Sequence, residues 1–505
     1  MIAAKGMDIV MQLIDKDLLS MQEVRELVEA AKEAQQELAR MNQAQVDHIV
    51  RAIADAGVRN ARRLAQMANE DTGFGIVDDK VIKNIFASQG VYEYIKDMKT
   101  IGEISRDEEK GIRAIAVPVG VIAGLIPSTN PTSTALYKAE IAIKAGNAIV
   151  FSPHPTALRC ILETVKVIRQ AISEAGGNEN LVSCITIPTM EATDNLMRHR
   201  DVAMILATGG SAMVRAAYSS GTPAIGVGPG NGPAFLEKTC DLPMAVKRIL
   251  DSKTFDNGTI CASEQSIICE EDMVSAVRAE VERQGGYFLD EEEREKLGRF
   301  ILRANGTMNP EIVGRSVATI AKLAGLDKVP TNARVLVAKE TGVGRGHPYS
   351  NEKLGPILAF YTAASCEEVC DKVCEILHYE GAGHTFSMHT KDDKVVDYFA
   401  KRVPASRILV NTASALGGIG GTTNLQPSLT LGCGAVGGSA TSENVGPAQL
   451  FNLRYVAYGS RELEDIRASV PNCSDGICRV DRGIDLSNID VDEIVRQIIG
   501  RLQAL

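Results

Sequence analysis

The sequence predicts an α/β protein in which a parallel, doubly wound sheet is followed by a second α/β domain. Between residues 112 and 210, apolar stretches alternate with segments whose apolar positions recur every three or four residues. The same alternation begins again after about residue 236. Glycine is abundant, at 45 residues, while aromatic residues make up 4% of the chain. This composition suits a fold with many tight turns better than a binding module built on aromatic anchors.

In the first half of the chain, apolar periodicity and glycine or proline stops define the elements. Amphipathic periodicity predicts helices over residues 20–70, 132–146 and 156–177. Apolar runs bounded by turn residues predict strands at 112–126, 148–153, 181–188 and 202–210. Strands that alternate with helices in this way form a parallel sheet covered on both faces.

Beyond residue 236 the pattern restarts and then gives way to loops. A strand at 235–240, a helix around 241–251 and a strand at 263–271 surround the segment that holds Cys261. Residues 417–446 are rich in glycine, but their interspersed leucine, valine and proline favour an ordered loop at a site over a disordered linker.

Charge and composition exclude several classes of protein. The 505 residues carry a net charge of -10 and show no basic stripe, which argues against a nucleic-acid partner. No run of 18 apolar residues occurs, so we expect no membrane span, and the charged N-terminal stretch does not resemble a secretory signal. The 11 cysteines lack the spacing of a disulfide framework. The expected location is therefore a reducing cytoplasm.

A glycine-rich turn at 205–218 has the residue types of a phosphate-binding site. An apolar strand runs into Gly209, Gly210 and Ser211 and then into a helix, whose first N–H groups are free to bind an anion. The full G-x-G-x-x-G spacing of a dinucleotide fingerprint is missing. A tight strand-to-helix turn therefore explains the pattern equally well.

Two further segments each present one reactive group. Between residues 125 and 140, two prolines stiffen a loop that holds Asn130 at the start of a helix. Its amide is either a donor to an oxyanion or an ordinary turn or capping residue. Between residues 254 and 266, Cys261 lies among small and polar residues. A working thiolate needs such access, whereas a structural cysteine usually lies among apolar neighbours.

Together these segments resemble the aldehyde dehydrogenase superfamily. With "HPYSNEKLGPILAFY" at 347–361 and "PSLTLGCGAVGGSATSENVGP" at 427–447, they are similar to its CoA-acylating branch, and most of all to the aldehyde dehydrogenase half of bifunctional aldehyde-alcohol dehydrogenases. The resemblance runs from about residue 20 to 458, and "FDNGTICASEQS" is its most specific part. It implies a Rossmann-type cofactor domain, an α/β catalytic domain and a small oligomerisation hairpin.

The resemblance also implies a role for each candidate residue. Cys261 is the expected nucleophile, and the expected oxyanion donors are Asn130 and the backbone N–H of Cys261. Glu352 matches the glutamate that holds the nicotinamide ribose of NAD. The pyrophosphate of NAD is expected to face Gly209, Gly210 and Ser211. The adenosine side of NAD is expected to face Ser152 and His154. Most hydrolytic members of the superfamily carry a lysine in the stretch that corresponds to Ser152 and His154.

One departure from the family pattern decides the expected reaction. Hydrolytic members carry a Glu-Leu-Gly-Gly-Lys-type motif upstream of the cysteine, and its glutamate activates water. Here the stretch is "IGVGPGNGP", and Gly226 falls at the position of the glutamate. Water without a base attacks a thioester slowly, whereas a CoA thiol, with a pKa near about 8.5, is partly thiolate at neutral pH. We therefore expect aldehyde, NAD and CoA to give acyl-CoA and NADH, reversibly.

Two alternatives remain: a hydrolytic dehydrogenase that uses another base, and a non-catalytic assembly subunit with the same fold. Gly226 argues against the first, and the intact Cys261, Asn130 and Glu352 argue against the second. A bifunctional enzyme is not expected, because no residues follow for an alcohol dehydrogenase half. Acetaldehyde and propionaldehyde are the expected substrates, and a homodimer or higher homo-oligomer is the expected assembly.

The resemblance, together with the composition and periodicity of the residues beyond 458, divides the chain into five parts. Residues 1–235 are expected to form the N-terminal helices and the NAD-binding domain, with an oligomerisation strand region near 105–118. The catalytic domain that carries Cys261 is expected at 236–430, and the chain returns to the cofactor and oligomerisation region at 431–458. A polar flexible linker follows at 459–486, and an amphipathic helix at 487–505.

The other histidines and cysteines predict no metal site. Cys366, Cys370, Cys374 and His378 recur every four residues, and four ligands along three helical turns cannot close a tetrahedron on one ion. Buried core cysteines explain this spacing better. His384 follows a glycine-rich turn and is either a hydrogen-bonded structural histidine or a site residue.

Residues 487–505 predict an amphipathic helix that needs a surface to cover its apolar face. That face is formed by Val491, Ile494, Val495, Ile498, Leu502 and Leu505. The segment follows a polar linker and lies beyond the family resemblance. It is similar to the encapsulation peptides that dock microcompartment enzymes on shell proteins, which places the enzyme in the cytoplasm or inside a bacterial microcompartment. Packing on its own domain is the alternative.

Overall fold

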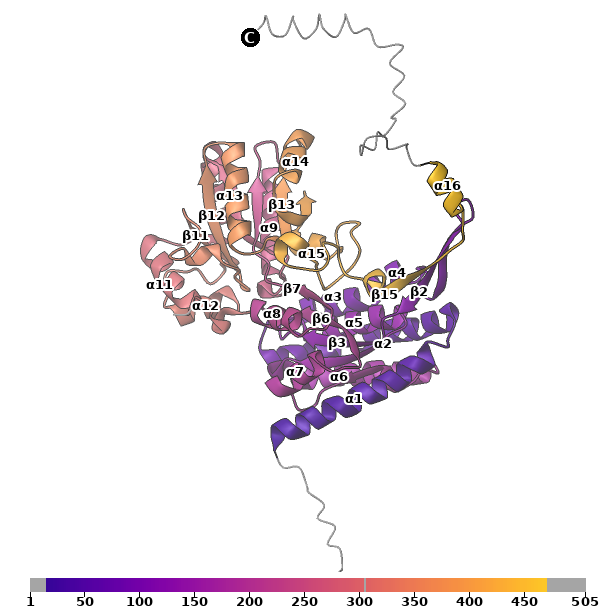
Figure 1. Ribbon diagram of the computed structural model, residues 1–505. Coiled ribbons are helices and arrows are strands. Elements are labelled where there is room, and N and C mark those ends of the chain that lie inside the picture. The colour runs from indigo at the N-terminus through magenta and orange to yellow at the C-terminus, as the bar shows by residue number, and fades with distance from the viewer. Residues whose placement is uncertain (1–14, 304–305, 470–505) are drawn as a thin grey trace, which may run out of the picture. The chain divides into compact units, whose positions relative to one another are not determined.

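The computed structural model describes residues 15–303 and 306–469 (Figure 1). Its contacts separate two compact units. One takes in the chain up to residue 104 and residues 115–454, and the other takes in residues 105–114 and the chain from 455 onward. Within the described ranges, no helix combines the length and the apolar character needed to cross a membrane.

The larger unit contains a five-stranded parallel sheet in the order β5-β4-β3-β6-β7. Its strands are β3 (Val121–Ile126), β4 (Ala148–Pro153), β5 (Val182–Cys184), β6 (Val202–Thr208) and β7 (Ala224–Val227). Because β3 pairs with both β4 and β6, the strand order reverses there. Open α/β sheets bind their ligands at the carboxyl ends of the strands at such a point.

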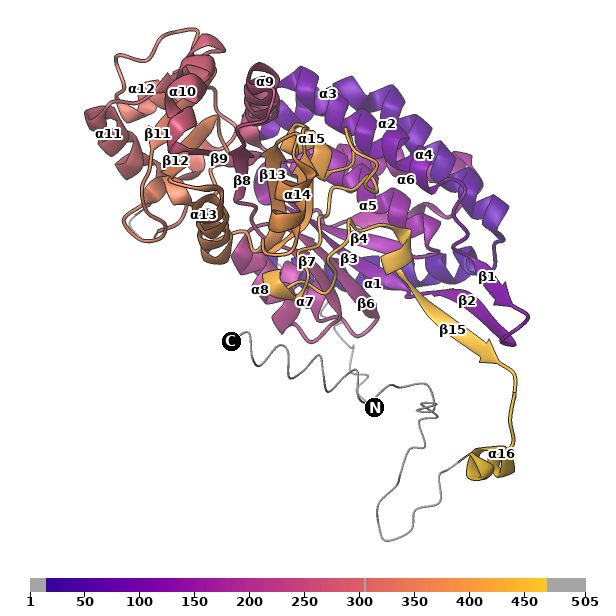
Figure 2. The same cartoon turned by 90° about the horizontal axis from the view of Figure 1, so that it is seen from above.

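Helices cover both faces of this sheet (Figure 2). On one face lie α5 (Pro131–Lys144) and α6 (Leu158–Glu174), with α2 (Gln43–Thr72) packed against them, and on the other lie α1 (Lys16–Leu38), α7 (Met190–Met197) and α8 (Ser211–Ser219). Every residue of α5 is buried. Its Lys138 donates to the carbonyl oxygens of Leu125 and Leu206, each at 2.8 Å. This lysine therefore ties together the two strands at the reversal point.

The N-terminal helices are set by local signals. Asn42 and Gln45 form a capping box at the start of α2, and Gly73, with φ of 66°, ends this helix in the left-handed conformation. The chain then continues through α3 (Val77–Ile85), a π-helical turn (Phe86–Gly90) and α4 (Val91–Ile95). The helical character predicted for residues 20–70 is confirmed as two helices, α1 and α2.

A seven-stranded parallel sheet in the same unit has the order β10-β11-β12-β9-β8-β13-β14. Its strands are β8 (Gly232–Leu236), β9 (Glu264–Glu270), β10 (Gly286–Phe288), β11 (Val335–Lys339), β12 (Ile357–Ala363), β13 (Gly383–His389) and β14 (Ala405–Val410). Ile267 and Ile268 of β9 enter two separate hydrophobic cores, because successive strand residues point to opposite faces. Six of the seven residues of β9 are buried, although Glu264, Gln265 and Ser266 are polar, as in a strand that is covered on both faces.

These two cores each have their own helices. Ile267 packs with α9 (Leu242–Thr254) and α10 (Val274–Arg283). The core of Ile268 contains α11 (Glu291–Ile301), α12 (Val317–Ala324), α13 (Cys366–Tyr379) and α14 (Asp393–Ala400). The prediction of an α/β fold with parallel sheets is therefore confirmed for both halves of the chain.

A further, three-stranded sheet has the order β1-β2-β15. Its members are β1 (Gly102–Asp107), β2 (Ile112–Pro118) and β15 (Phe451–Ala457). The strands predicted within 112–126 are confirmed as β2 and β3, and the chain turns between them at Gly120, with φ of 127°. The short helix α16 (Leu463–Ala468) lies within the range predicted as a linker. The amphipathic segment 487–505 lies outside the described residues.

Candidate active site

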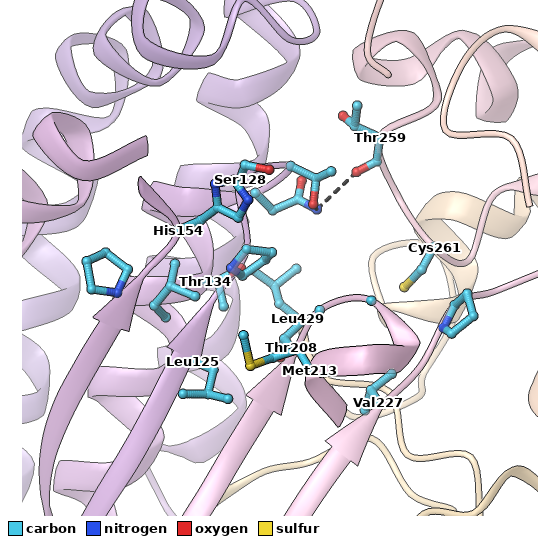
Figure 3. Close-up of a pocket in the computed structure, with 18 of the residues that line it drawn as sticks. Leu125, Ser128, Thr134, His154, Thr208, Met213, Val227, Thr259, Cys261 and Leu429 are labelled. Carbon is cyan, nitrogen blue, oxygen red and sulfur yellow. Dashed lines mark hydrogen bonds between the residues drawn. The ribbon is translucent and has the colours of Figure 1, made fainter. Parts of the chain in front are cut away.

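A cavity of about 440 Å³ opens at the carboxyl ends of β3, β4, β6 and β7 (Figure 3). Its wall also includes residues 259–261, which precede β9, and Glu352. Ile419, Leu429 and Leu431 bring the glycine-rich segment into the same wall. The two large sheets therefore contribute to one chamber, and the glycine-rich segment is part of it.

All but one of the candidate residues line this cavity, namely Asn130, Ser152, His154, Gly209, Gly210, Cys261 and Glu352. The exception is Ser211, the first residue of α8, whose side chain is exposed and does not belong to the wall. That Ser211 faces the pyrophosphate of NAD stays a prediction. Ser211 can still offer its backbone N–H, as any residue at a helix N-terminus does.

Cys261 is reached through a backbone turn in a rare conformation. Asp256 and Asn257 have φ of 50° and 52°, within the 3₁₀ turn Phe255–Gly258. Non-glycine residues avoid this region unless their surroundings hold them there. Burial, Glu352 and Cys433 raise the pKa of the Cys261 thiol to about 12, and Arg407 opposes this shift. The thiol is therefore protonated at neutral pH in this structure.

Asn130 occupies the N-cap position of α5, but its side chain makes no capping hydrogen bond. Instead, its Nδ2 donates to the carbonyl oxygen of Thr259 at 3.0 Å. Its Oδ1 accepts a hydrogen bond from Nζ of Lys83 at 2.6 Å. The amide is thus held between α3 and the loop that carries Cys261, on which Thr259 also lies (Figure 3). This geometry argues against the interpretation of Asn130 as a simple cap.

Lys83 and Asp256 are site residues that the sequence analysis missed. The Asp256 carboxylate is fully buried and binds the ammonium groups of Lys80 and Lys83 through Oδ2, at 3.0 and 2.5 Å. Burial lowers the pKa of Lys83 to about 8, and Asp256 opposes this shift. Asp256 lies within the segment "FDNGTICASEQS", but its contact with Lys83 leaves no local signal, because the two residues lie 173 positions apart in the sequence.

Glu352 lines the same cavity as Cys261. Its Oε1 accepts the backbone N–H of Gly230 at 2.9 Å, and its own N–H donates to Oε2 of Glu380 at 2.6 Å. Burial and Glu380 raise the pKa of Glu352 to about 8. The adjacent Lys353 fixes the chain here, since its Nζ donates to the Tyr349 carbonyl oxygen at 2.6 Å. The position of Glu352 is thus set by backbone contacts on both sides.

Gly226 does not occupy the position inferred for it. A Cβ at Gly226 would lie 2.7 Å from Val214 and 2.9 Å from Tyr218, both on α8. The next residue, Val227, lines the cavity instead (Figure 3). The inference was wrong by one residue, because successive residues of β7 point to opposite faces. Valine, like glycine, cannot accept a proton, so this part of the wall still lacks a base.

Gly230 brings the loop after β7 against the cysteine. A Cβ at Gly230 would lie 1.9 Å from the carbonyl oxygen of Cys261 and 3.2 Å from Cε1 of His384. His384 is buried and its Nδ1 lies 2.9 Å from Oγ1 of Thr385, while its Nε2 has no hydrogen-bond partner in the described part of the structure. Burial and Arg407 lower the pKa of His384 to about 3, so its imidazole is neutral. Both interpretations of His384 stay open.

The remaining cavity residues fit a dinucleotide. A Cβ at Gly210 would meet nothing within 4 Å, so the turn before α8 leaves room for a phosphate beside free N–H groups. Ser152 bonds to Thr193 through their hydroxyls at 2.8 Å, and Nδ1 of His154 accepts the Thr156 N–H at 3.3 Å. Burial lowers the pKa of His154. Among residues 15–303 and 306–469, no group of three or more metal-ligating side chains occurs.

The comparisons with known proteins decide the family. The model described as "Aldehyde dehydrogenase family" matches residues 13–285. The succinate-semialdehyde dehydrogenase (acetylating) of Clostridium kluyveri is 37% identical over 441 residues, which cover 87% of this chain and 97% of that protein. This chain belongs to the aldehyde dehydrogenase family. The bifunctional aldehyde-alcohol dehydrogenase AdhE of Escherichia coli K12 is 46% identical over 440 residues, or 86% of this chain. This family member spans about half the length of that relative, 49%.

Solved structures share the fold of this family member. A probable aldehyde dehydrogenase from Listeria monocytogenes EGD-e is 63% identical with a TM-score of 0.89, covering 90% of this chain and 100% of that one. Two propionaldehyde dehydrogenases both have a TM-score of 0.78 and cover 86% of this chain and 97% of their own. One, from the Clostridium phytofermentans fucose utilisation bacterial microcompartment, is 28% identical. The other, from Rhodopseudomonas palustris with bound CoA and an acylated cysteine, is 27% identical. The aldehyde dehydrogenase-like fold is therefore confirmed.

Proposed function

We propose that this chain is an NAD-dependent, CoA-acylating aldehyde dehydrogenase that acts on short-chain aldehydes. One observation carries this proposal: Cys261, the Asn130 amide and Glu352 converge in one cavity at the point where the strand order reverses. The acetylating dehydrogenase of Clostridium kluyveri and the Rhodopseudomonas palustris structure with CoA and an acylated cysteine support the same chemistry.

The proposed reaction begins at Cys261. Its sulfur attacks the aldehyde carbonyl carbon, and the oxyanion that forms accepts hydrogen bonds from Nδ2 of Asn130 and from the Cys261 backbone N–H. A bound NAD supplies the hydride acceptor. Loss of hydride from the tetrahedral adduct leaves a thioester on Cys261. Arg407 is the cationic group that lowers the pKa of this thiol, so it favours the attacking thiolate.

The residues of the cavity wall indicate whether water or CoA accepts the acyl group of the thioester. Val227 lies where a water-activating base would be needed and cannot take a proton. A CoA thiol has a pKa near about 8.5 and is a far better nucleophile than neutral water at pH 7. The acyl group therefore passes to CoA. Because one thioester replaces another, the reaction is reversible.

In this proposal NAD is held by three parts of the site. Gly209 and Gly210 face the pyrophosphate together with the N–H groups of α8, and Glu352 accepts hydrogen bonds from the nicotinamide ribose. Ser152 and His154 lie at the adenosine side. Because burial lowers the pKa of His154, this side carries a neutral imidazole at pH 7.

The test is NADH formation with aldehydes of two to four carbons, with and without CoA. With CoA, we expect continuous turnover. Without CoA, we expect a burst of NADH that does not exceed one equivalent per site, because the thioester accumulates on Cys261. Sustained turnover without CoA would instead support the hydrolytic alternative. The same panel identifies the preferred aldehyde, for which acetaldehyde and propionaldehyde are the proposed substrates.

We further propose that the enzyme is a homo-oligomer and that residues 487–505 dock it on a microcompartment shell protein. The relative from the fucose utilisation microcompartment and the amphipathic sequence pattern support this proposal. Deletion of 487–505 should leave CoA-dependent activity nearly intact and abolish recruitment to a shell, and this segment should carry a fused fluorescent protein to the shell. Loss of activity or folding on deletion would show that the segment packs on the enzyme itself.

A further inference from the structure

We propose that Lys83 is a positioning residue for the reaction, because it fixes which end of the Asn130 amide faces the substrate. This inference rests on the proposed function, in which the Asn130 amide holds the oxyanion. Only the NH₂ end of an asparagine side chain can do so, since its oxygen is an acceptor and would repel the developing negative charge.

The chemistry of lysine makes this assignment definite. An ammonium group has three donors and no acceptor, so the Asn130 atom that lies 2.6 Å from Nζ of Lys83 must be the oxygen. The NH₂ group then has to point the other way. One of its hydrogens is donated to the Thr259 carbonyl oxygen at 3.0 Å. The second hydrogen is donated to Oγ1 of Thr129 at 3.3 Å, the longer of the two bonds, and an oxyanion in the cavity that Asn130 and Cys261 line together can accept it in place of Thr129.

Lys83 is itself held in place. Its side chain is 3% exposed, and its Nζ binds Oδ2 of Asp256 at 2.5 Å and Oγ1 of Thr259 at 3.2 Å. Asp256 is fixed in turn, because its Oδ1 accepts the Ile76 N–H and its own N–H donates to Asp79, each at 2.7 Å. The ammonium group therefore has one position, and so does the amide that it contacts.

The same cluster provides a matched control. Lys80 binds the same oxygen of Asp256 at 3.0 Å and is equally buried. Its other hydrogen bond, at 3.4 Å, goes to the Thr129 carbonyl oxygen and not to the Asn130 side chain. Replacing either lysine removes one buried charge from Asp256, but only replacement of Lys83 frees the Asn130 amide.

Without Lys83, the amide can rotate by half a turn and present its oxygen to the oxyanion. Removal of one oxyanion donor typically lowers kcat by about 10²–10³-fold. We therefore expect Lys83→Met to slow the NADH burst about 100-fold, with the Kd for NAD unchanged, and Lys80→Met to slow it less than tenfold.

The experiment measures the burst rate in wild type, Lys83→Met, Lys80→Met, Asn130→Ala and the double variant Lys83→Met/Asn130→Ala. If Lys83 acts through Asn130, the double variant is no slower than Asn130→Ala alone. A merely structural lysine would add its own loss in the double variant. Should Lys83→Met not fold, Lys83→Met/Asp256→Asn is compared with Lys80→Met/Asp256→Asn, since both pairs remove one charge of each sign.

The outcomes separate this inference from the proposed function. Equal losses for the two lysine variants, or additive losses in the double variant, would overturn the role of Lys83 while the wild type stays active with CoA. A wild type without CoA-dependent NADH formation would refute the proposed function, and the role of Lys83 with it.

Discussion

Gly230 is where the space around Cys261 can be tested most directly. In Gly230→Ala the new Cβ would lie 1.9 Å from the Cys261 carbonyl oxygen and 2.8 Å from its carbonyl carbon. Both are backbone atoms, so no side chain can turn away to make room. Since ordinary contact begins at 3.4 Å, the Cys261 backbone must retreat by roughly 1.5 Å.

A displacement of this size acts on catalysis before it acts on folding. Misplacing a reacting group by about 1 Å costs on the order of 100-fold in rate. We therefore expect Gly230→Ala to lower kcat/KM for the aldehyde at least about 100-fold, since both the sulfur and the backbone N–H donor move. The assay is the NADH burst at saturating NAD, followed by CoA-dependent turnover.

Gly228 in the same loop is the matched control. A Cβ there would meet nothing within 4 Å, and neither glycine has a positive φ that alanine would avoid. The backbone change is therefore the same in both variants, and only the available space differs. We expect Gly228→Ala to lose less than tenfold in kcat/KM, and the thermal unfolding midpoint of each variant shows that it is folded at the assay temperature. A Gly230→Ala enzyme within threefold of wild type would refute the reasoning.

Three further predictions follow from the same site. Because burial raises the pKa of Glu352 to about 8, its carboxylate forms as the pH rises, so the KM for NAD should fall between pH 7 and 9. In Glu352→Gln, the KM for NAD should not fall with pH, and at pH 9 it should be about 10–100-fold higher than in wild type, as expected for the loss of a charge-assisted hydrogen bond. A KM for NAD equal to that of wild type would contradict the contact of Glu352 with the ribose. Because the thiol pKa of Cys261 is about 12, its alkylation by iodoacetamide should keep rising from pH 7 to 10, and a plateau by pH 8 would contradict this protonation state. Cys261→Ser should lower turnover by several orders of magnitude while NAD binding persists, and near-normal activity would remove Cys261 as the nucleophile.

The sequence by itself determined those features of this protein that depend on residues close to one another along the chain. Apolar runs and amphipathic periods predicted the alternating elements, because side-chain burial repeats with the period of each element. The segment around Cys261 and the loop at Asn130 could be found for a similar reason, since each reactive group lies within a short, recognisable motif. The same holds for Glu352 in "NEKLGP".

Only the tertiary structure decided how those groups face one another. Gly226 and Val227 exchange roles because β7 points successive side chains to opposite faces, and a sequence does not show which face meets the cavity. Ser211, the first residue of α8, is not among the residues that line the cavity, which its sequence position next to Gly210 does not reveal. Lys83 reaches Asp256 across 173 residues, and Gly230 reaches the Cys261 backbone from another loop. Contacts of this kind depend on how whole elements pack, so no local pattern can encode them.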